Sequence, residues 1–258
     1  MDDKNYLVSI ITPSYNSENY IGETFKSIQE QTYTNWEWIV IDDYSTDNSL
    51  NILLELEKAD PRIKIFKNNI TSGPGPSRNK GIEKANGDFL TFIDSDDYWD
   101  SKFIEKSLTT SIKQNVDFVF ASYERWNETF TIQFESFIVP HKVNYYDILK
   151  SCPISCLTAF IRIEKHHKIY MPSLPKRQDY VLWLEYLKII PYAVGIQEPL
   201  AKYRIRKNSV SSNKYKVIKY QFLVYYKIQK IGLLKSIYYL INWAIAGFFK
   251  YKSIKKTN

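Results

Sequence analysis

The amino-acid sequence predicts an α/β fold in which helices flank a mainly parallel sheet. Over the first 120 residues, short apolar runs alternate with amphipathic segments, and this alternation is typical of repeated strand–helix–strand units. The chain has 258 residues, of which 44% are apolar and 24% charged, so its composition suits a substantial packed core and not a disordered chain. The two cysteines are too few for a disulfide framework, which fits a reducing compartment.

The first half of the chain contains five expected strands and four expected helices. The strands are short runs rich in apolar and β-branched residues, at 7–12, 36–42, 63–67, 89–93 and 118–123. The helices have apolar residues at helical spacing, at 19–31, 47–58, 77–85 and 101–114. We expect Asp47 to cap the second helix and Gly87 to take the left-handed position after the third.

The second half of the chain is less regular. Four prolines interrupt residues 124–175, and the next clear helix is expected at 178–190. From Lys214 the sequence is helical in type and rich in tyrosine and lysine. We therefore divide the chain into one domain of residues 1–212, with halves at 1–123 and 124–212, and a helical tail at 213–258.

Charge is distributed unevenly along the chain. The formal net charge is +7, yet residues 1–198 hold all 28 acidic residues and 21 of the 35 basic ones, a net charge of −7. Residues 199–258 hold the other 14 basic residues and no acidic residue. A tail with this charge favours an anionic partner, either nucleic acid or a membrane with acidic lipid headgroups.

The acidic turn after the fourth strand is the main candidate for a chemical site. Asp94, Asp96 and Asp97 follow a buried strand directly, and Asp42 and Asp43 end the second strand. Ligands bind open parallel sheets at the carboxyl ends of the strands, and paired carboxylates suit a hard divalent cation that also takes phosphate oxygens. Aspartates also end strands and cap helices, and this structural alternative stays open.

Several motifs, taken in order, resemble the opening of the family 2 inverting glycosyltransferases. These motifs lie at residues 8–16, 28–33, 40–47, 77–81 and 85–97. The resemblance covers residues 6–120 strongly and 175–212 more loosely. It implies an A-type nucleotide-sugar-binding fold, a nucleotide-sugar half at 1–123, an acceptor half at 124–212, and inversion at the anomeric carbon.

The resemblance also implies roles for residues on the nucleotide side. The residues expected to line a uridine site are Pro13, Tyr15 and Asp43. Arg78 is expected near the nucleotide or its phosphates, where its guanidinium makes forked contacts with phosphate oxygens. The alternative for Arg78 is an ordinary helix residue with its charge in solvent.

A divalent cation, Mn²⁺ or Mg²⁺, is the expected cofactor. By the resemblance, Asp94 and Asp96 form the metal and ribose motif, with Asp96 as the more direct ligand. When the bond to the sugar breaks, negative charge develops on the β-phosphate of UDP, and a bound cation stabilises this charge as a Lewis acid.

Inverting transfer needs a carboxylate that takes the proton of the attacking hydroxyl. Members of the family usually carry a Glu-Asp pair at the start of a helix in the second half, with the Asp as the base. The matching residues here are Gln178 and Asp179, so the glutamate is replaced and the aspartate retained. The alternative for Asp179 is the N-cap of a helix that begins at Tyr180.

Residues 203–211 resemble the flexible segment that folds over the diphosphate in this family, with Arg206 at the position of a His or Arg. A charged surface loop is the alternative for this segment.

The tail predicts attachment to an anionic membrane surface; ordinary helices packed against the core, and a true membrane span, are the alternatives. Residues 231–249 are mostly apolar but include Lys235, Ser236 and Asn242, so no uninterrupted part reaches the ~20 residues that span a bilayer. Lysines and tyrosines on both sides suit the membrane interface. We expect a peripheral protein at the cytoplasmic face of the bacterial inner membrane, since residues 1–5 lack the basic start of a signal peptide.

A membrane-bound enzyme with a nucleotide-sugar suggests a lipid-linked acceptor. By resemblance to bacterial O-antigen and capsule enzymes, the expected reaction moves glucose or galactose from a UDP-sugar to GlcNAc- or GalNAc-diphosphate-undecaprenol, through a β-1,3 linkage. The alternatives are a nucleic-acid-binding protein, which the basic tail favours, and a non-catalytic nucleotide-sugar-binding protein. We expect no nucleic-acid partner, and a dehydrogenase is disfavoured because residues 73–78 lack the third glycine of its motif.

Overall fold

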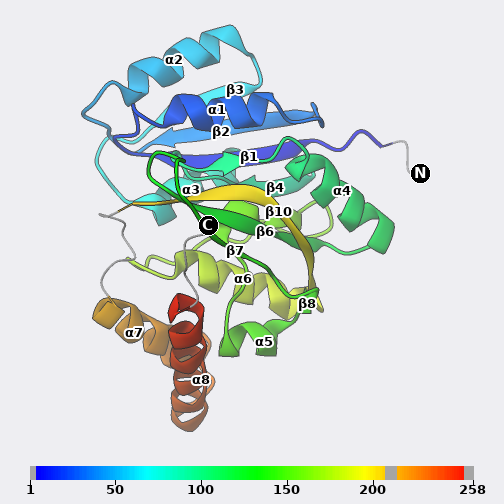
Figure 1. Cartoon of the computed structure of the whole chain (residues 1–258), viewed down its shortest axis with the longest axis vertical. Helices are drawn as coiled ribbons and strands as arrows, with labels where there is room; N and C mark the ends of the chain where they lie inside the picture. Colours follow the sequence, from blue (N-terminus) through cyan, green and yellow to red (C-terminus); the bar gives the residue numbers. More distant parts are fainter. Residues whose placement is uncertain (1–3, 207–213, 253–258) are drawn as a thin grey trace.

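A ten-stranded sheet forms the centre of the protein, whose computed structural model describes residues 4–206 and 214–252 (Figure 1). The strand order is β3-β2-β1-β4-β9-β6-β10-β5, with β7 beside β6 and β8 beside β10. Four strands of the first half are parallel, namely β1 (Val8–Ser14), β2 (Trp36–Asp42), β3 (Ile63–Lys67) and β4 (Phe89–Phe92).

The second half of the chain continues the same sheet. The long strands β6 (Phe118–Asn127) and β10 (Ala193–Ile205) are parallel to each other, and β9 (Phe160–Arg162) lies antiparallel between β4 and β6. Three shorter strands pair antiparallel, namely β5 (Tyr98–Trp99), β7 (Gln133–Phe137) and β8 (Lys142–Val143). The predicted α/β fold is confirmed, and its longest strand pairings are parallel.

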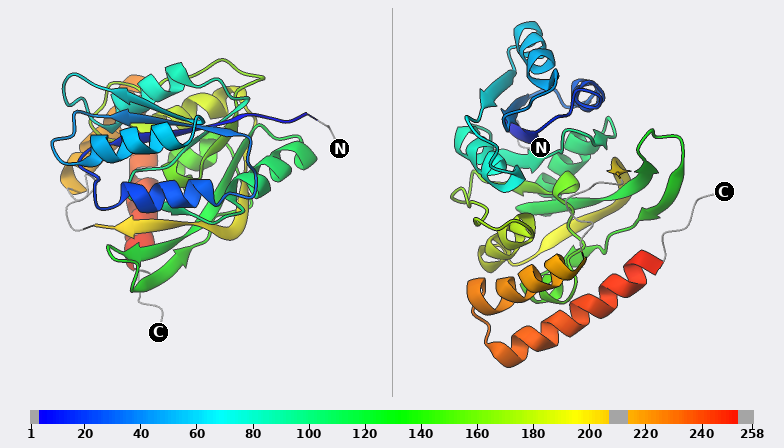
Figure 2. Two further views of the ribbon diagram at one scale, coloured as in Figure 1. Left: turned by 90° about the horizontal axis from the view of Figure 1, so that it is seen from above. Right: turned by 90° about the vertical axis from the view of Figure 1, so that its left-hand side faces the viewer.

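Helices cover both faces of the sheet, as Figure 2 shows. One face packs against α1 (Ile21–Gln29), α2 (Ser49–Ala59) and α4 (Phe103–Gln114), and the other against α3 (Pro74–Lys84) and α6 (Gln178–Ile189). Because side chains of a strand alternate between faces, Ile10 of β1 packs with the first group and Ile11 with the second. The strands are therefore apolar on both faces, as buried parallel strands must be.

The C-terminal helices lie beneath α6, at the lower end of the molecule in Figure 1. They are α7 (Lys214–Leu223), the π-helical turn η2 (Val224–Ile228) and α8 (Leu233–Lys252), next to α5 (Tyr145–Lys150). Buried Tyr225 of η2 donates a hydrogen bond to the backbone oxygen of Leu149 at 2.6 Å. The described helices include none with the length and apolar character needed to cross a membrane.

Two local predictions were wrong for physical reasons. Gly87 does not have a positive φ; a Cβ there would lie 2.7 Å from the Leu7 oxygen and the Ser9 nitrogen, so the glycine permits a close backbone approach to β1. The third helix starts at Pro74, three residues earlier than expected, because proline fits the first helical position. Asp47 lies just before the N-cap residue Asn48, and its carboxylate accepts the Ser49 N–H at 3.0 Å.

Candidate active site

The loops that follow β1 and β2 are tied together at the carboxyl edge of the sheet. The Asp43 N–H donates to the Ser14 oxygen at 2.7 Å, and the Asn16 side chain accepts the Thr46 N–H at 2.9 Å. Asn16 and Tyr44 both have left-handed backbones, with φ of 47° and 67°. Pro13, near the end of β1, is half-buried, and Tyr15, directly after β1, is 50% exposed, so the Tyr15 ring is open to a ligand.

Asp43 organises the loop in front of α3. Its buried carboxylate accepts hydrogen bonds from the side chain of Asn68 (2.8 Å), from the N–H and hydroxyl of Ser72 (2.9 and 2.7 Å), and from the N–H of Gly73 (2.7 Å). Burial alone raises the pKa of a carboxyl, but these hydrogen bonds outweigh it, so the pKa of Asp43 lies below its ordinary value. Asp43 is thus an ionised anchor that fixes the turn into α3.

Arg78 of α3 forms an ion pair with Asp94, directly after β4. The arginine is buried, its Nη2 donates to Asp94 Oδ1, and its Nε has no hydrogen-bond partner among the described residues. Burial opposes the charge of Arg78, yet nearby negative groups, Asp94 first among them, raise its pKa. The alternative of a solvent-facing arginine is therefore wrong: Arg78 is a buried cation within the site.

The acidic turn after β4 carries more negative charge than its partners balance. Asp96 pairs with Arg206 at 2.8 Å, and burial together with the charge of Asp94 raises the pKa of Asp96 in spite of this pairing. Burial also raises the pKa of Asp97, and the charges of Asp96 and Asp94 add to the effect. A cation bound at this turn would relieve the repulsion.

The acidic turn is held against the end of β10 by Arg204, which the sequence analysis gave no role. Its backbone N–H donates to Asp97 at 2.9 Å, its Nε donates to the Asp96 backbone oxygen at 2.6 Å, and its guanidinium pairs with Glu23 of α1. Arg204, near the end of β10, and Arg206, directly after it, place both guanidiniums within 5 Å of the Tyr20 ring. The Arg-x-Arg sequence at the end of β10 is the pattern from which this pair could have been predicted.

Asp179 is the second residue of α6 and lies in the electrostatic neighbourhood of Arg78 and Cys156. Its charge is among those that raise the pKa of Arg78 and of Cys156. The helix begins at Gln178 and its N-cap residue is Arg177, without a capping side chain, so the alternative in which Asp179 is the N-cap of a helix beginning at Tyr180 is wrong. Before it, buried Gln178 packs against α3, where a Cβ on Gly75 would lie 3.0 Å from the Gln178 Cγ.

Cys156, in the short helix η1 (Cys156–Thr158), is a neighbour that no sequence pattern indicated. Burial raises the pKa of its thiol, Arg78 opposes this effect, and Asp94 and Asp179 add to it. The structure therefore pairs Arg78 with Asp94, and Asp179 and Cys156 are near enough to Arg78 to interact with it electrostatically. Asp96 of the same acidic turn pairs with Arg206. Residues 207–211 of the expected flexible segment lie outside the described residues.

The two carboxylates Asp94 and Asp96 fit the predicted metal site. Both present hard oxygen atoms, each with a guanidinium on one oxygen, Arg78 on Asp94 and Arg206 on Asp96. No three His, Cys, Asp or Glu side chains converge in the part of the chain that the structure describes. A cation held here thus needs further oxygen ligands, such as those of a diphosphate.

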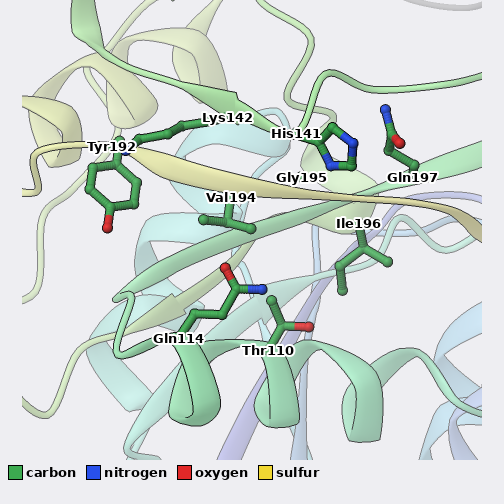
Figure 3. A pocket seen from close by; sticks show the side chains of 9 residues that line it. All are labelled: Thr110, Gln114, His141, Lys142, Tyr192, Val194, Gly195, Ile196 and Gln197. Atoms are coloured by element: carbon green, nitrogen blue, oxygen red, sulfur yellow. The ribbon is translucent and has the colours of Figure 1, made fainter.

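A separate pocket of about 490 Å³ lies at the other end of β10 (Figure 3). Its lining comes from α4, the β8 region and the start of β10, and includes Gln114, His141 and Tyr192. It contains none of the predicted site residues, and Lys142 lies over the Tyr192 ring at 3.3 Å. The pocket is therefore no part of the candidate active site.

Comparison with protein families and solved structures shows which known proteins this chain resembles. Residues 9–169 match the family model described as "Glycosyl transferase family 2". An Escherichia coli protein, the "UDP-Glc:alpha-D-GlcNAc-diphosphoundecaprenol beta-1,3-glucosyltransferase WfgD", is 38% identical over 261 residues, which cover 99% of this chain and 100% of that protein.

Two solved structures share the fold. The S. aureus TarS fragment in complex with UDP-GlcNAc superposes with a TM-score of 0.70 at 23% identity, over 85% of this chain and 66% of that one. The mannosyltransferase PcManGT from Pyrobaculum calidifontis, in complex with GDP-Man and Mn²⁺, gives a TM-score of 0.64 at 16% identity, over 90% of this chain and 69% of that one. Asp179 lies outside the residues that the family model matches.

Proposed function

Because this chain belongs to glycosyl transferase family 2, we propose that it transfers a hexose from a UDP-sugar to a sugar linked to undecaprenyl diphosphate, with inversion. The likeness to WfgD spans nearly the whole of both chains, which favours glucose as the hexose, GlcNAc as the acceptor sugar and a β-1,3 linkage. Galactose and GalNAc are the alternatives. We assign the reaction to the assembly of O-antigen or capsule.

The observation that carries this proposal is the position of Arg78 between two carboxylates. Its guanidinium forms an ion pair with Asp94, which follows β4, and interacts electrostatically with Asp179 of α6. An inverting transfer needs a positive group where the diphosphate leaves and a base on the other side of the sugar. Arg78 and Asp179 suit these two tasks.

The nucleotide side of the site uses the edge formed by β1 and β2. We assign Pro13 and Tyr15 to the walls of the uridine site, since the Tyr15 ring is exposed there. Asp43 contributes by holding Ser72 and Gly73, and thereby the start of α3 and Arg78. Arg206 lies beside the same turn and is available to the diphosphate if it exchanges its contact with Asp96.

Asp96 and Asp94 are the proposed ligands of Mn²⁺ or Mg²⁺. Bound there, the ion would neutralise charge on the departing diphosphate. Arg78 of α3 would stabilise the same negative charge on the diphosphate, because its guanidinium is always protonated. The crowding of Asp94, Asp96 and Asp97 supports this assignment, because three carboxylates within one turn repel one another without a cation.

Asp179 is the proposed general base. It takes the proton from the acceptor hydroxyl while the hydroxyl oxygen attacks the anomeric carbon from the face opposite UDP. The bond between this carbon and the UDP oxygen breaks as the new glycosidic bond forms, so an α-linked nucleotide-sugar gives a β-linked product. The transition state has oxocarbenium character, as in glycoside hydrolysis.

The tail is the proposed contact with the membrane, at the cytoplasmic face of the bacterial inner membrane. Leu234, Ile237, Tyr238, Ile241 and Ile245 of α8 are exposed, by 83%, 42%, 53%, 54% and 54%. At 100° per residue they form one apolar stripe, which we call the α8 stripe. The lysines of the tail, from Lys214 onward, suit anionic headgroups, and we expect no nucleic-acid partner.

Incubation of the protein with synthetic GlcNAc-diphosphate-lipid and a panel of UDP-sugars, with and without Mn²⁺, tests this proposal. We expect transfer with one UDP-hexose and a β-linked product by NMR. An α-linked product would contradict inversion. Binding of UDP without transfer to any acceptor would favour the non-catalytic alternative, and salt-sensitive binding of RNA without UDP binding would favour the nucleic-acid alternative.

A further inference from the structure

Arg177, at the start of α6, has an unusual conformation and an incomplete set of partners. Its φ is 70°, a left-handed backbone that costs energy for any residue except glycine. Its Nε is buried without a hydrogen-bond partner, and within the described residues Arg177 forms no ion pair with a carboxylate. A guanidinium in this state has capacity for an anionic ligand.

Aromatic rings hold the guanidinium of Arg177 in place. It lies 4.8 Å from the ring of Trp243 on α8 and 5.5 Å from the ring of Tyr180 on α6. Tyr180 is itself fixed, because its hydroxyl donates to the Ile148 oxygen at 3.1 Å and its ring meets Tyr225 edge-on at 6.4 Å. Arg177 is therefore preorganised at the junction of α6 and α8.

The two faces of α8 connect this junction to the surface. At 100° per residue, Trp243 lies about 180° from Leu234, so it points away from the α8 stripe. The buried residue on the same inner side is Ser236, which confirms that this side faces the protein. A lipid chain lying along the α8 stripe is therefore separated from Arg177 by the width of α8, about 10 Å.

Arg177 and Asp179 are two positions apart in the chain and have different neighbours. The charge of Asp179 raises the pKa of Arg78 and of Cys156 in the candidate active site, whereas the guanidinium of Arg177 lies over Trp243 of α8. Their Cα atoms are at most about 7.6 Å apart, because consecutive Cα atoms are about 3.8 Å apart. Arg177 and Asp179 can therefore act on neighbouring groups of one ligand.

Building on the proposed function, we infer that Arg177 binds the phosphate that is attached to the acceptor sugar. The sugar then reaches Asp179 with its attacking hydroxyl, the phosphate meets Arg177, and the lipid continues toward α8 and the membrane. Trp243 and Tyr180 keep the guanidinium in position for this contact. The site thereby selects a sugar on a lipid phosphate over a free sugar.

The test compares two acceptors that carry the same sugar, GlcNAc-diphosphate-lipid and the uncharged octyl glycoside of GlcNAc. We expect Arg177→Gln to raise the KM for the diphosphate acceptor roughly tenfold or more, the loss typical of a charged hydrogen bond. The KM for the UDP-sugar and all parameters with the uncharged acceptor should stay within about twofold. Activity on the uncharged acceptor also reports that the variant is folded.

Arg62→Gln is the matched control, because Arg62 also stacks on a tryptophan, 3.6 Å from the ring of Trp36, but lies at the opposite edge of the sheet. It should leave both KM values unchanged. An equal effect of Arg177→Gln on the two acceptors, or an effect no larger than that of Arg62→Gln, would overturn the inference while leaving the proposed function intact. Absence of transfer by the unmodified protein to either acceptor would instead contradict the proposed function.

Discussion

At the scale of single residues, Asp179 carries the most demanding assignment, because a base is effective only if its carboxylate accepts the proton. We expect Asp179→Asn to lower kcat by about 10²- to 10⁴-fold, the usual contribution of general-base catalysis, with an unchanged KM for the UDP-sugar. Steady-state kinetics of UDP release measure both. Glu185→Gln, on the same helix and paired with Lys188, is the control and should retain full activity. A folded Asp179→Asn variant with normal kcat would remove Asp179 from the mechanism.

Asp43 gives a prediction about stability and pH. Its pKa in the folded protein lies below the ordinary value of 3.8, so its stabilising effect is complete above about pH 4 and is lost as the pH falls through the lowered pKa. Asp43→Asn should therefore lower the free energy of unfolding by about 1–3 kcal/mol at pH 7 and by less at pH 3.

Urea denaturation at pH 7, 5 and 3 measures this difference between Asp43→Asn and the unmodified protein. The control is Glu55→Gln, whose carboxylate is exposed and, within residues 4–206 and 214–252, pairs with Lys58 on the surface. A destabilisation by Asp43→Asn that is the same at all three pH values would show that the charge of Asp43 is not its source.

The sequence predicted the residues of the site better than their partners. The acidic turn and Arg78 could be recognised because short motifs after strands place them at one edge of the sheet. Arg204 and Cys156 could not, since their surroundings depend on elements far apart in the chain: Arg204 forms an ion pair with Glu23, and the pKa of Cys156 responds to the charge of Arg78.

At the scale of elements, α3 joins the two halves of the site. It carries Arg78, and the next residue, Asn79, makes two hydrogen bonds with the backbone of Met171, 2.8 Å to its oxygen and 2.7 Å from its N–H. The segment after Met171 leads to α6 and Asp179. The contact of Gln178 with Gly75 is a second link between α3 and α6.

We expect Asn79→Leu to destabilise the protein by about 1–3 kcal/mol, because leucine leaves both backbone groups of Met171 unpaired. Urea denaturation gives the magnitude. Glu83→Gln, on an exposed position of the same helix, is the control and should change the free energy of unfolding by less than about 0.5 kcal/mol. If the two variants are equally stable, the clamp on Met171 contributes nothing to the fold.

Strands and helices of the first half followed from local patterns, since parallel strands buried on both faces are continuous apolar runs. The strands β7 to β10 could not be predicted from local patterns. In β10, Pro199 and two irregularities in its pairing with β6 interrupt the apolar pattern, so its strand character comes from the neighbouring strand and not from its own sequence.

At the scale of the whole molecule, the opposite charges of the two parts favour one orientation on a membrane. The tail and the α8 stripe should face anionic lipid, while the acidic body stays in solution. The double variant Ile237→Ser/Ile241→Ser should reduce binding to vesicles that contain anionic lipid by about tenfold or more, since each buried isoleucine contributes about 1.5–3 kcal/mol.

Cosedimentation with vesicles at low and high salt measures this binding. Leu54→Ser on α2, a similarly exposed apolar residue on the other side of the molecule, should have no effect. Equal binding by the double variant and the unmodified protein would contradict the assigned orientation, and binding that salt does not weaken would contradict a role for the basic residues.

The central claim is that the acidic turn after β4 holds a divalent cation while UDP departs. The most direct test is the initial rate of transfer from UDP-glucose to GlcNAc-diphosphate-lipid, measured with Mn²⁺ and again with excess EDTA. We expect the rate to be at least about a hundredfold lower in EDTA and to recover when Mn²⁺ is restored. Equal rates in the two conditions would contradict it.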